Sequence, residues 1–306
     1  MKVVQLYHSS TGNSRLCASV FADEAGRQGA VCETFDIRDV GDGKELIERI
    51  RGCDLFGVTV PTYYFKAPVN VLEFLETLPA FEPKPLFVLN SCTSISSNTI
   101  AMAANLLQQK NLFLIDRLIV HGEESYPPFR WKSLIPQKGK PGAKELERVR
   151  EFARGVCEKA GEIRSDPDYT FRHRHYKIWP TPFHFIAISA SRRNLMRYML
   201  GKRLVADACT SCGVCAQKCP TGSIRLSPHA LKAIEGRRDA VVRRRGELCA
   251  KLADSPDGTL MLPVFLDTCM GCYACVNFCP VSAIYTPVAA GRPPYRGPEG
   301  DCPKPR

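Results

Sequence analysis

Short, nearly continuous runs of hydrophobic residues recur along the first 120 residues of the chain. Turn-forming residues bound five such runs, at 2–7, 31–37, 54–60, 85–91 and 112–120. Strands that are covered on both faces of a sheet read as continuous apolar runs and not as alternating patterns. The pattern therefore predicts five buried strands of a parallel sheet.

Between and after these runs, apolar residues recur at helical spacing. The predicted helices lie at about 15–28, 44–51, 67–77, 98–109 and 143–163. Alternating strands and helices predict an α/β doubly wound parallel sheet, for which right-handed crossovers favour the order 2-1-3-4-5. Ligands of such sheets bind beyond the carboxyl ends of the strands. Here the loops 8–14, 61–66 and 91–98 are expected to meet there.

Two copies of the run C-x2-C-x2-C-x3-C-P lie 60 residues apart. Their cysteines are Cys209, Cys212, Cys215 and Cys219, and Cys269, Cys272, Cys275 and Cys279. In bacterial iron–sulfur proteins with this run, the fourth cysteine ligates the cluster of the other run, because a tight loop supplies only three thiolates to one cubane. The sequence therefore predicts two [4Fe-4S] clusters. One takes Cys209, Cys212, Cys215 and Cys279, and the other takes Cys269, Cys272, Cys275 and Cys219.

Zinc and disulfides are the alternatives for these cysteines. Structural zinc sites pair their ligands across a longer gap, and a chain without a secretory start is a poor candidate for a disulfide framework. Residues of about 203–287 resemble the bacterial two-[4Fe-4S] ferredoxins. The chain departs from them in the 49 residues between Cys219 and Cys269, which are more than the usual short connection. The excess, about 228–258, is predicted to be helical.

The loop after the first strand is rich in hydroxyl and amide side chains and opens a helix. Backbone N–H groups and hydroxyls at a helix N-terminus form an anion site. The loop has neither the lysine of a nucleoside-triphosphate loop nor the G-x-G-x-x-G of a dinucleotide site. A monophosphate ester fits better, and a simple helix cap is the alternative.

Three segments of the first 120 residues resemble the flavin-binding loops of flavodoxins. This resemblance implies that FMN is bound, with its phosphate held by Ser9, Thr11, Gly12, Asn13 and Ser14. It implies that the isoalloxazine ring faces Pro61, Thr62, Tyr63 and Tyr64, and Asn90, Ser91, Cys92 and Thr93. The third segment contains no aromatic residue to stack on the ring. The two tyrosines are alternatively plain core residues.

The charge of the chain is unevenly distributed. Its net charge is +11, but residues 1–125 have a balance of −4 and residues 126–306 one of +15. Thiolate-bound clusters and a flavin phosphate would offset much of the basic half, so no nucleic-acid partner is expected. Five arginines cluster in the predicted helical insert, at Arg237, Arg238, Arg243, Arg244 and Arg245. This face is either simply solvated or docks an acidic redox protein.

The remaining segments are less informative. Residues 126–142 form a Pro-rich basic loop, and 166–202 is interpreted as a linker that packs between domains, docks a partner or contacts a membrane surface. Its three histidines are a weak candidate for a metal site, namely His173, His175 and His184. The expected domains are 1–165 and 203–290, followed by a tail at 291–306. The absence of a signal peptide, of a transmembrane run and of disulfides indicates the cytoplasm.

As a whole, the chain resembles fused flavodoxin-like and two-cluster ferredoxin proteins. The resemblance implies an electron-transfer protein that passes electrons between two clusters, FMN and redox partner proteins. A flavoenzyme that reduces a small molecule, quinone-like or other, at FMN is the alternative. No catalytic constellation is predicted, and the sequence indicates neither the partners nor the oligomeric state.

Overall fold

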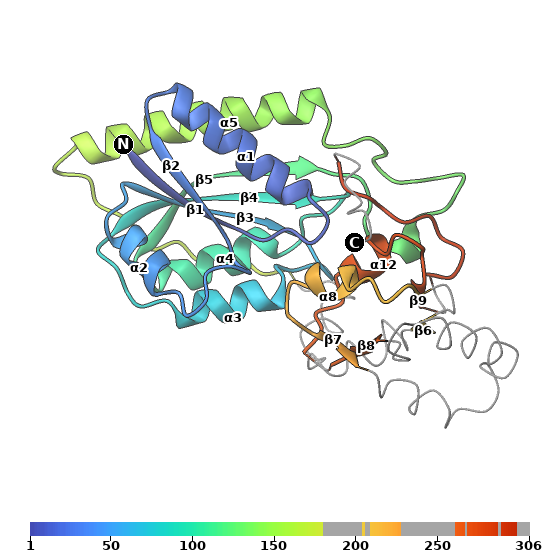
Figure 1. Ribbon diagram of the computed structural model, residues 1–306. Coiled ribbons are helices and arrows are strands. Elements are labelled where there is room, and N and C mark those ends of the chain that lie inside the picture. Colours follow the sequence, from blue (N-terminus) through green and yellow to red (C-terminus); the bar gives the residue numbers. More distant parts are fainter. Residues whose placement is uncertain (180–203, 206–208, 228–260, 267, 287–288, 299–306) are drawn as a thin grey trace, which may run out of the picture. The chain divides into compact units, whose positions relative to one another are not determined.

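The computed structural model describes most of the chain (Figure 1). The described residues are 1–179, 204–205, 209–227, 261–266, 268–286 and 289–298. They divide into two compact units. The first comprises Met1–Glu124 and Ile135–Ser189, and the second comprises Ser125–Leu134 and Ala190–Arg306.

The first unit is built on a five-stranded parallel sheet. Its strands are β1 (Lys2–Tyr7), β2 (Val31–Asp36), β3 (Leu55–Pro61), β4 (Lys84–Cys92) and β5 (Leu112–His121). Neighbouring strands pair in the order β2-β1-β3-β4-β5, all parallel. The predicted strand order is confirmed, and it is the flavodoxin-like order.

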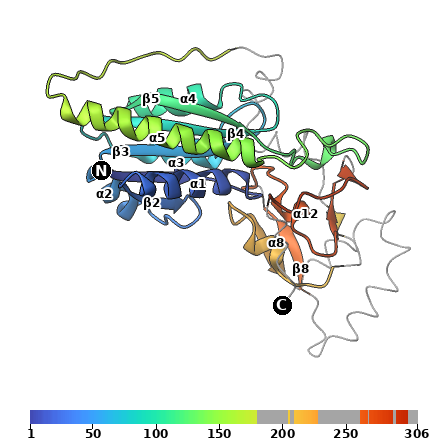
Figure 2. The same ribbon diagram turned by 90° about the horizontal axis from the view of Figure 1, so that it is seen from above.

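Helices cover both faces of this sheet, as Figures 1 and 2 show. They are α1 (Asn13–Arg27), α2 (Lys44–Arg51), α3 (Val69–Thr77), α4 (Thr99–Gln108) and α5 (Ala143–Ser165). The apolar sides of α1 and α5 pack together on one face, and those of α2, α3 and α4 pack on the other. Two separate cores therefore hold the sheet between them.

The core beneath α1 and α5 depends on a close fit of aromatic rings. Phe21 of α1 stacks on Phe87 of β4 with ring centroids 4.3 Å apart. Phe87 lies directly over Gly57 of β3, where an added Cβ would come within 2.0 Å of the ring. The missing side chain at Gly57 is what leaves room for this ring.

The second unit consists of small elements related by the repeat. Two helical turns, α8 (Val214–Gln217) and α12 (Ala274–Asn277), each contain the third cysteine of one run. Two antiparallel pairs complete the described part: β6 (Leu204–Val205) with β9 (Ile284–Tyr285), and β7 (Ile224–Ser227) with β8 (Leu262–Phe265). The short 3-10 helix η1 (Pro127–Phe129) also belongs to this unit.

The division into units differs from the sequence-based boundaries in two places. Part of the Pro-rich loop, Ser125–Leu134, belongs to the second unit, although it joins β5 to α5 of the first. The described start of the expected linker belongs to the first unit. The predicted helical insert at 228–258, with its arginines, lies outside the described residues, as do His184 and the end of the tail.

We expect Gly57→Ala to destabilise the first unit strongly. The new methyl group would overlap a buried ring that is itself stacked on Phe21, and overpacking of this kind costs about 1–3 kcal/mol or more. Urea unfolding, followed by circular dichroism, measures the loss.

Gly155→Ala is the matched control. Gly155 lies in the middle of α5, where an added Cβ meets nothing within 4 Å. The change should therefore stabilise the helix by about 0.5–1 kcal/mol. Equal stabilities of the two variants would contradict the close fit at Phe87.

Candidate functional sites

The first candidate site lies at the carboxyl edge of the parallel sheet, where the loop after β1 leads into α1. Gly12 precedes the helix with φ at 107°, a left-handed conformation that glycine adopts without strain. The hydroxyl of Ser9 accepts a hydrogen bond from the Gly12 N–H at 3.0 Å. The loop is thus folded by its own side chains.

Two hydroxyls of this loop bind other loops of the first unit. Ser10 hydrogen-bonds the Tyr63 hydroxyl, and Ser14 hydrogen-bonds the Ser91 hydroxyl at 2.7 Å. Thr11 differs, since its hydroxyl makes no side-chain hydrogen bond within the described part of the chain. Thr11 is therefore the hydroxyl of this loop that is left for a ligand.

The predicted second and third loops are joined side by side. Thr62 donates a backbone hydrogen bond to the Ser91 carbonyl at 2.9 Å, and its hydroxyl lies 3.2 Å from Asn90 Oδ1. The Asn90 amide donates to the Val60 carbonyl at 2.9 Å. The side chains of Thr62 and Asn90 thus hold the two loops together, a role that the flavodoxin resemblance did not imply.

Two aromatic residues form a strained turn in the second loop. Tyr63 and Lys66 exchange backbone hydrogen bonds of 2.9 and 3.1 Å. The residues between them, Tyr64 and Phe65, have φ values of 51° and 64°. A bulky residue in this region costs roughly 1–2 kcal/mol, and such strain gathers at ligand sites. Tyr63 and Tyr64 are half-buried, so neither is an ordinary core residue.

Cys92 and Thr93 end β4 and begin the third loop. Cys92 is buried, and burial raises the pKa of its thiol to about 11. The carbonyl of Thr93 lies 3.0 Å from His121 Nδ1. Pro61, the last residue of β3, is also buried. These residues support the edge of the site.

Several buried polar atoms near these loops have no hydrogen-bond partner among the described residues. They are His8 Nε2, Asn70 Oδ1, Ser96 Oγ and Ser97 Oγ. Buried polar groups are nearly always hydrogen-bonded, and exceptions mark places where a water, ion or ligand binds. A polar ligand at this edge therefore fits the atoms present.

His8 is the most buried titratable group of this edge. It follows β1, its backbone N–H donates to the Thr59 carbonyl at 3.0 Å, and its ring faces Tyr63 edge-on. Burial lowers the pKa of His8 to about 4. The imidazole is therefore neutral at physiological pH.

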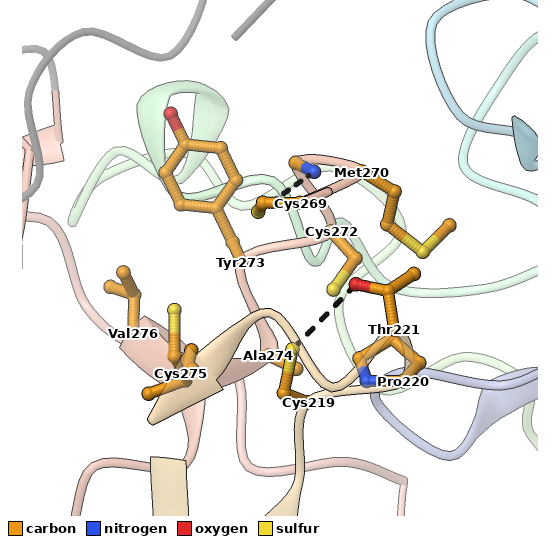
Figure 3. Close-up of a pocket in the computed structure, with 12 residues that line it drawn as sticks. Cys219, Pro220, Thr221, Cys269, Met270, Cys272, Tyr273, Ala274, Cys275 and Val276 are labelled. Carbon is orange, nitrogen blue, oxygen red and sulfur yellow. Dashed lines mark hydrogen bonds between the residues drawn. The ribbon is translucent and has the colours of Figure 1, made fainter. Parts of the chain in front are cut away.

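The cysteines of the second unit line two separate hollows. Figure 3 shows the first, in which Cys219 of the first run lies with Cys269, Cys272 and Cys275 of the second. The second hollow is lined by Cys209, Cys212 and Cys215 together with Cys279. The structure thus brings together the two sets that the sequence predicts, each with one cysteine from the opposite run.

These sulfurs surround a space and do not converge on one point. Among the described residues, no three His, Cys, Asp or Glu side chains form a group that could hold a single metal ion. Burial, with nearby thiols adding to it, raises the pKa of Cys215 to about 12. Thiolates in such a place require compensating positive charge from what they bind.

The backbone around the two hollows repeats at a constant offset of 60 residues. Three pairs of positions have positive φ in both copies. The pairs are Ser211 and Gly271, Gly213 and Tyr273, and Gly222 and Ser282. Because the copies bend at the same places, the repeat extends from the cysteines to the whole cysteine-binding loop.

The fourth cysteine of each run accepts a backbone hydrogen bond four residues later. Ser223 N–H donates to Cys219 Sγ at 3.2 Å, and Ala283 N–H donates to Cys279 Sγ at 3.1 Å. The two copies differ in side chains. Beside Cys219, the Thr221 hydroxyl lies 3.7 Å from the sulfur, whereas Val281 occupies the equivalent position beside Cys279.

Asn277 joins three segments of the second unit, which the sequence analysis missed. It lies between Cys275 and Cys279 and is fully buried. Its side chain donates to the Ser125 carbonyl at 2.8 Å and accepts from the Tyr295 N–H at 2.9 Å. Ser125–Leu134 and the start of the expected tail are therefore parts of the support of this cysteine loop. The x3 spacing of the run gives no hint of such a role.

Residues 208–284 match the family of 4Fe-4S dicluster domains. This stretch of the second unit is a 4Fe-4S dicluster domain. No curated protein sequence matches the chain. None of the helices in the described ranges has the length and apolar character needed to cross a membrane.

Solved structures similar to this chain include two flavodoxins. An archaeal flavodoxin is 14% identical over 53% of this chain and 99% of its own, with a TM-score of 0.40. A flavodoxin from Streptococcus pneumonia TIGR4 is 17% identical over 52% of this chain and 99% of its own, with a TM-score of 0.40. A flavone reductase is 13% identical over 56% of this chain and 66% of its own, with a TM-score of 0.43.

The buried His8 predicts a pH dependence of stability. Its pKa is about 4 in the folded chain and about 6.5 when unfolded, so the unfolded state takes up more protons between these values. Stability is therefore lost as the pH falls from 6.5 towards 4, by roughly 2 kcal/mol from this group at about pH 5. Urea unfolding at about pH 7 and pH 5 should show a smaller difference for His8→Gln than for the wild type. Equal differences would contradict a neutral, buried His8.

Proposed function

We propose that this chain is an electron-transfer iron–sulfur flavoprotein that holds two [4Fe-4S] clusters and FMN. The observation that supports it most is the grouping of the eight cysteines into two sets, each completed by the opposite run. The flavodoxin-like sheet of the same chain has orphaned polar atoms at its ligand-binding edge. A cubane moves single electrons and a flavin takes one or two, so together they link one-electron and two-electron partners.

The thiolates of each cysteine set would hold one cluster. N–H and O–H donors to cysteine sulfur stabilise the more negative, reduced state and so raise the potential. Cys219 has both the Ser223 N–H and the Thr221 hydroxyl nearby, whereas the described surroundings of Cys279 supply the Ala283 N–H. We therefore infer that the cluster completed by Cys219 has the higher potential of the two.

The loop after β1 would hold the FMN phosphate. Its backbone N–H groups and the start of α1 attract the anion, and Thr11 supplies a hydroxyl that no side chain of the described residues engages. Ser9, Ser10 and Ser14 keep the loop in shape through their own hydrogen bonds. The paired loops at Thr62 and Asn90 would carry the ring, with the Tyr63 turn beside it.

Redox proteins are the partners that such a carrier requires, since it has no small substrate of its own. The predicted arginine-rich insert would favour acidic partners, because complementary charge raises encounter rates.

Thr11→Ala should weaken FMN binding without loss of iron. A phosphate oxygen that loses its hydroxyl donor costs about 1.5–3 kcal/mol, which corresponds to roughly 10- to 150-fold in the dissociation constant. Titration of flavin-free protein with FMN measures the dissociation constant. Thr11→Ser, which keeps the hydroxyl, is the control and should bind nearly as the wild type. Unchanged affinity of Thr11→Ala, or a wild type that binds no flavin, would refute the flavin assignment.

Cys219→Ala should damage the cluster built on Cys269, Cys272 and Cys275. The loss of one thiolate leaves a three-iron species, visible by electron paramagnetic resonance. The reciprocal variant Cys279→Ala should damage the other cluster instead. Cys157→Ala, at a buried thiol of the first unit, is the control and should leave both clusters intact. If each variant damages the cluster of its own run, the exchange of ligands is wrong.

A further inference from the structure

After α5, the chain crosses the outer side of α4 as an extended strap, residues 169–179. Three amide side chains, one at the N-cap position of α4 and two within the helix, each bind both the N–H and the C=O of one strap residue. Asn98 binds Trp179 at 3.0 and 3.0 Å, Asn105 binds Tyr176 at 2.8 and 2.9 Å, and Gln108 binds Arg174 at 2.6 and 2.8 Å. The three amide side chains bind the extended backbone of the strap, and the strap runs antiparallel to α4.

The distance spanned by the three amides along α4 matches the distance spanned by their partners along the strap. From Asn98 to Gln108, ten residues of helix rise by about 15 Å. From Arg174 to Trp179, five extended residues cover about 17 Å. The strap therefore lies along the length of α4 in one register.

The other end of the strap is anchored by aromatic rings. Phe171 stacks on Phe113 with centroids 5.0 Å apart, and His173 meets the same ring edge-on. Phe113 lies at the start of β5, at the amino edge of the parallel sheet. The strap therefore runs from this edge to the carboxyl edge, where the candidate flavin loops lie.

At the carboxyl edge, Asn98 connects the strap to two of these loops. Its backbone N–H donates to the Phe65 carbonyl at 3.3 Å, in the second loop. It directly follows Ser96 and Ser97 of the third loop, whose hydroxyls lack partners among the described residues. Asn98 therefore contacts the Trp179 backbone through its side chain and the second loop through its backbone.

Trp179 is 61% exposed, although Asn98 binds its backbone N–H and C=O. The Lys177 ammonium lies 4.1 Å from the centre of its ring. The third loop, residues 90–98, has no aromatic residue to stack on a flavin. We propose that Trp179 packs against the isoalloxazine ring and supplies the aromatic contact that this loop lacks.

This inference rests on the proposed flavin site and deepens it. The strap, which follows α5 in the chain, is then part of the flavin site. The amide side chains of α4 position its Trp179 there. Lys177, which lies over the Trp179 ring, would then bring a positive charge near the flavin, and such a charge favours the more negative reduced flavin. A partner-docking tryptophan is the competing interpretation, and it predicts no effect on flavin binding.

The test compares FMN binding by full-length variants at the two ends of the strap. Trp179→Ala should raise the dissociation constant about tenfold or more, as expected for the loss of a ring stacked on a base. Trp179→Phe, which keeps an aromatic ring, should recover most of the affinity. Tyr169→Ala removes a 43% exposed ring from the far end of the strap and should stay within about twofold of the wild type.

The absorption spectrum of bound flavin distinguishes a direct contact of Trp179 with the ring from an indirect effect of the strap on the site. At saturating FMN, the visible absorption bands of the flavin should shift in Trp179→Ala and remain unchanged in Tyr169→Ala. Affinity and spectrum of Trp179→Ala equal to those of the wild type would overturn the inference, and so would equal losses for the Ala and Phe variants at 179. A wild type that binds no FMN would refute the proposed function itself.

Discussion

A short loop that wraps three thiolates around one centre cannot turn back to supply a fourth. The second unit meets this constraint by duplication, and each hollow is lined by three cysteines of one run and one of the other. The exchange requires both loops to bend alike, and the shared positive φ values at an offset of 60 residues show that they do. It also requires support around the loops, which Asn277 provides by joining Ser125 and Tyr295. The proposed clusters depend on this arrangement.

In the first unit, the main constraint is the placement of three loops at the carboxyl edge of the parallel sheet. Hydroxyl and amide groups that look like ligands in the sequence are bound to other loop residues, Ser14 to Ser91 and Thr62 to Asn90, and few groups are left to contact a ligand. A ligand bound as proposed would meet backbone N–H groups, the Thr11 hydroxyl and a strained aromatic turn. The strap adds a segment from beyond α5 to the same edge. More residues of this edge thus hold the loops in place than are left to contact a ligand.

The sequence predicted the parts of this protein that depend on local patterns. Continuous apolar runs predicted the five strands, and right-handed crossovers predicted their order. The cysteine spacing predicted which sulfurs line each hollow. It did not predict the strap, because Asn98, Asn105 and Gln108 read as ordinary polar positions of a surface helix. Their meaning depends on a segment 66 to 81 residues away. Nothing local in the Pro-rich loop indicates that Ser125–Leu134 belongs to the second unit.

The proposed function requires that electrons pass between clusters and flavin within one molecule. Rapid mixing of the oxidised, anaerobically purified protein with a limiting one-electron reductant, followed by flavin absorbance and cluster signals, tests it most directly. We expect the clusters and the flavin to exchange electrons at a first-order rate that does not change on dilution. A rate that falls with protein concentration, or a flavin that stays oxidised while the clusters are reduced at all driving forces, would contradict it.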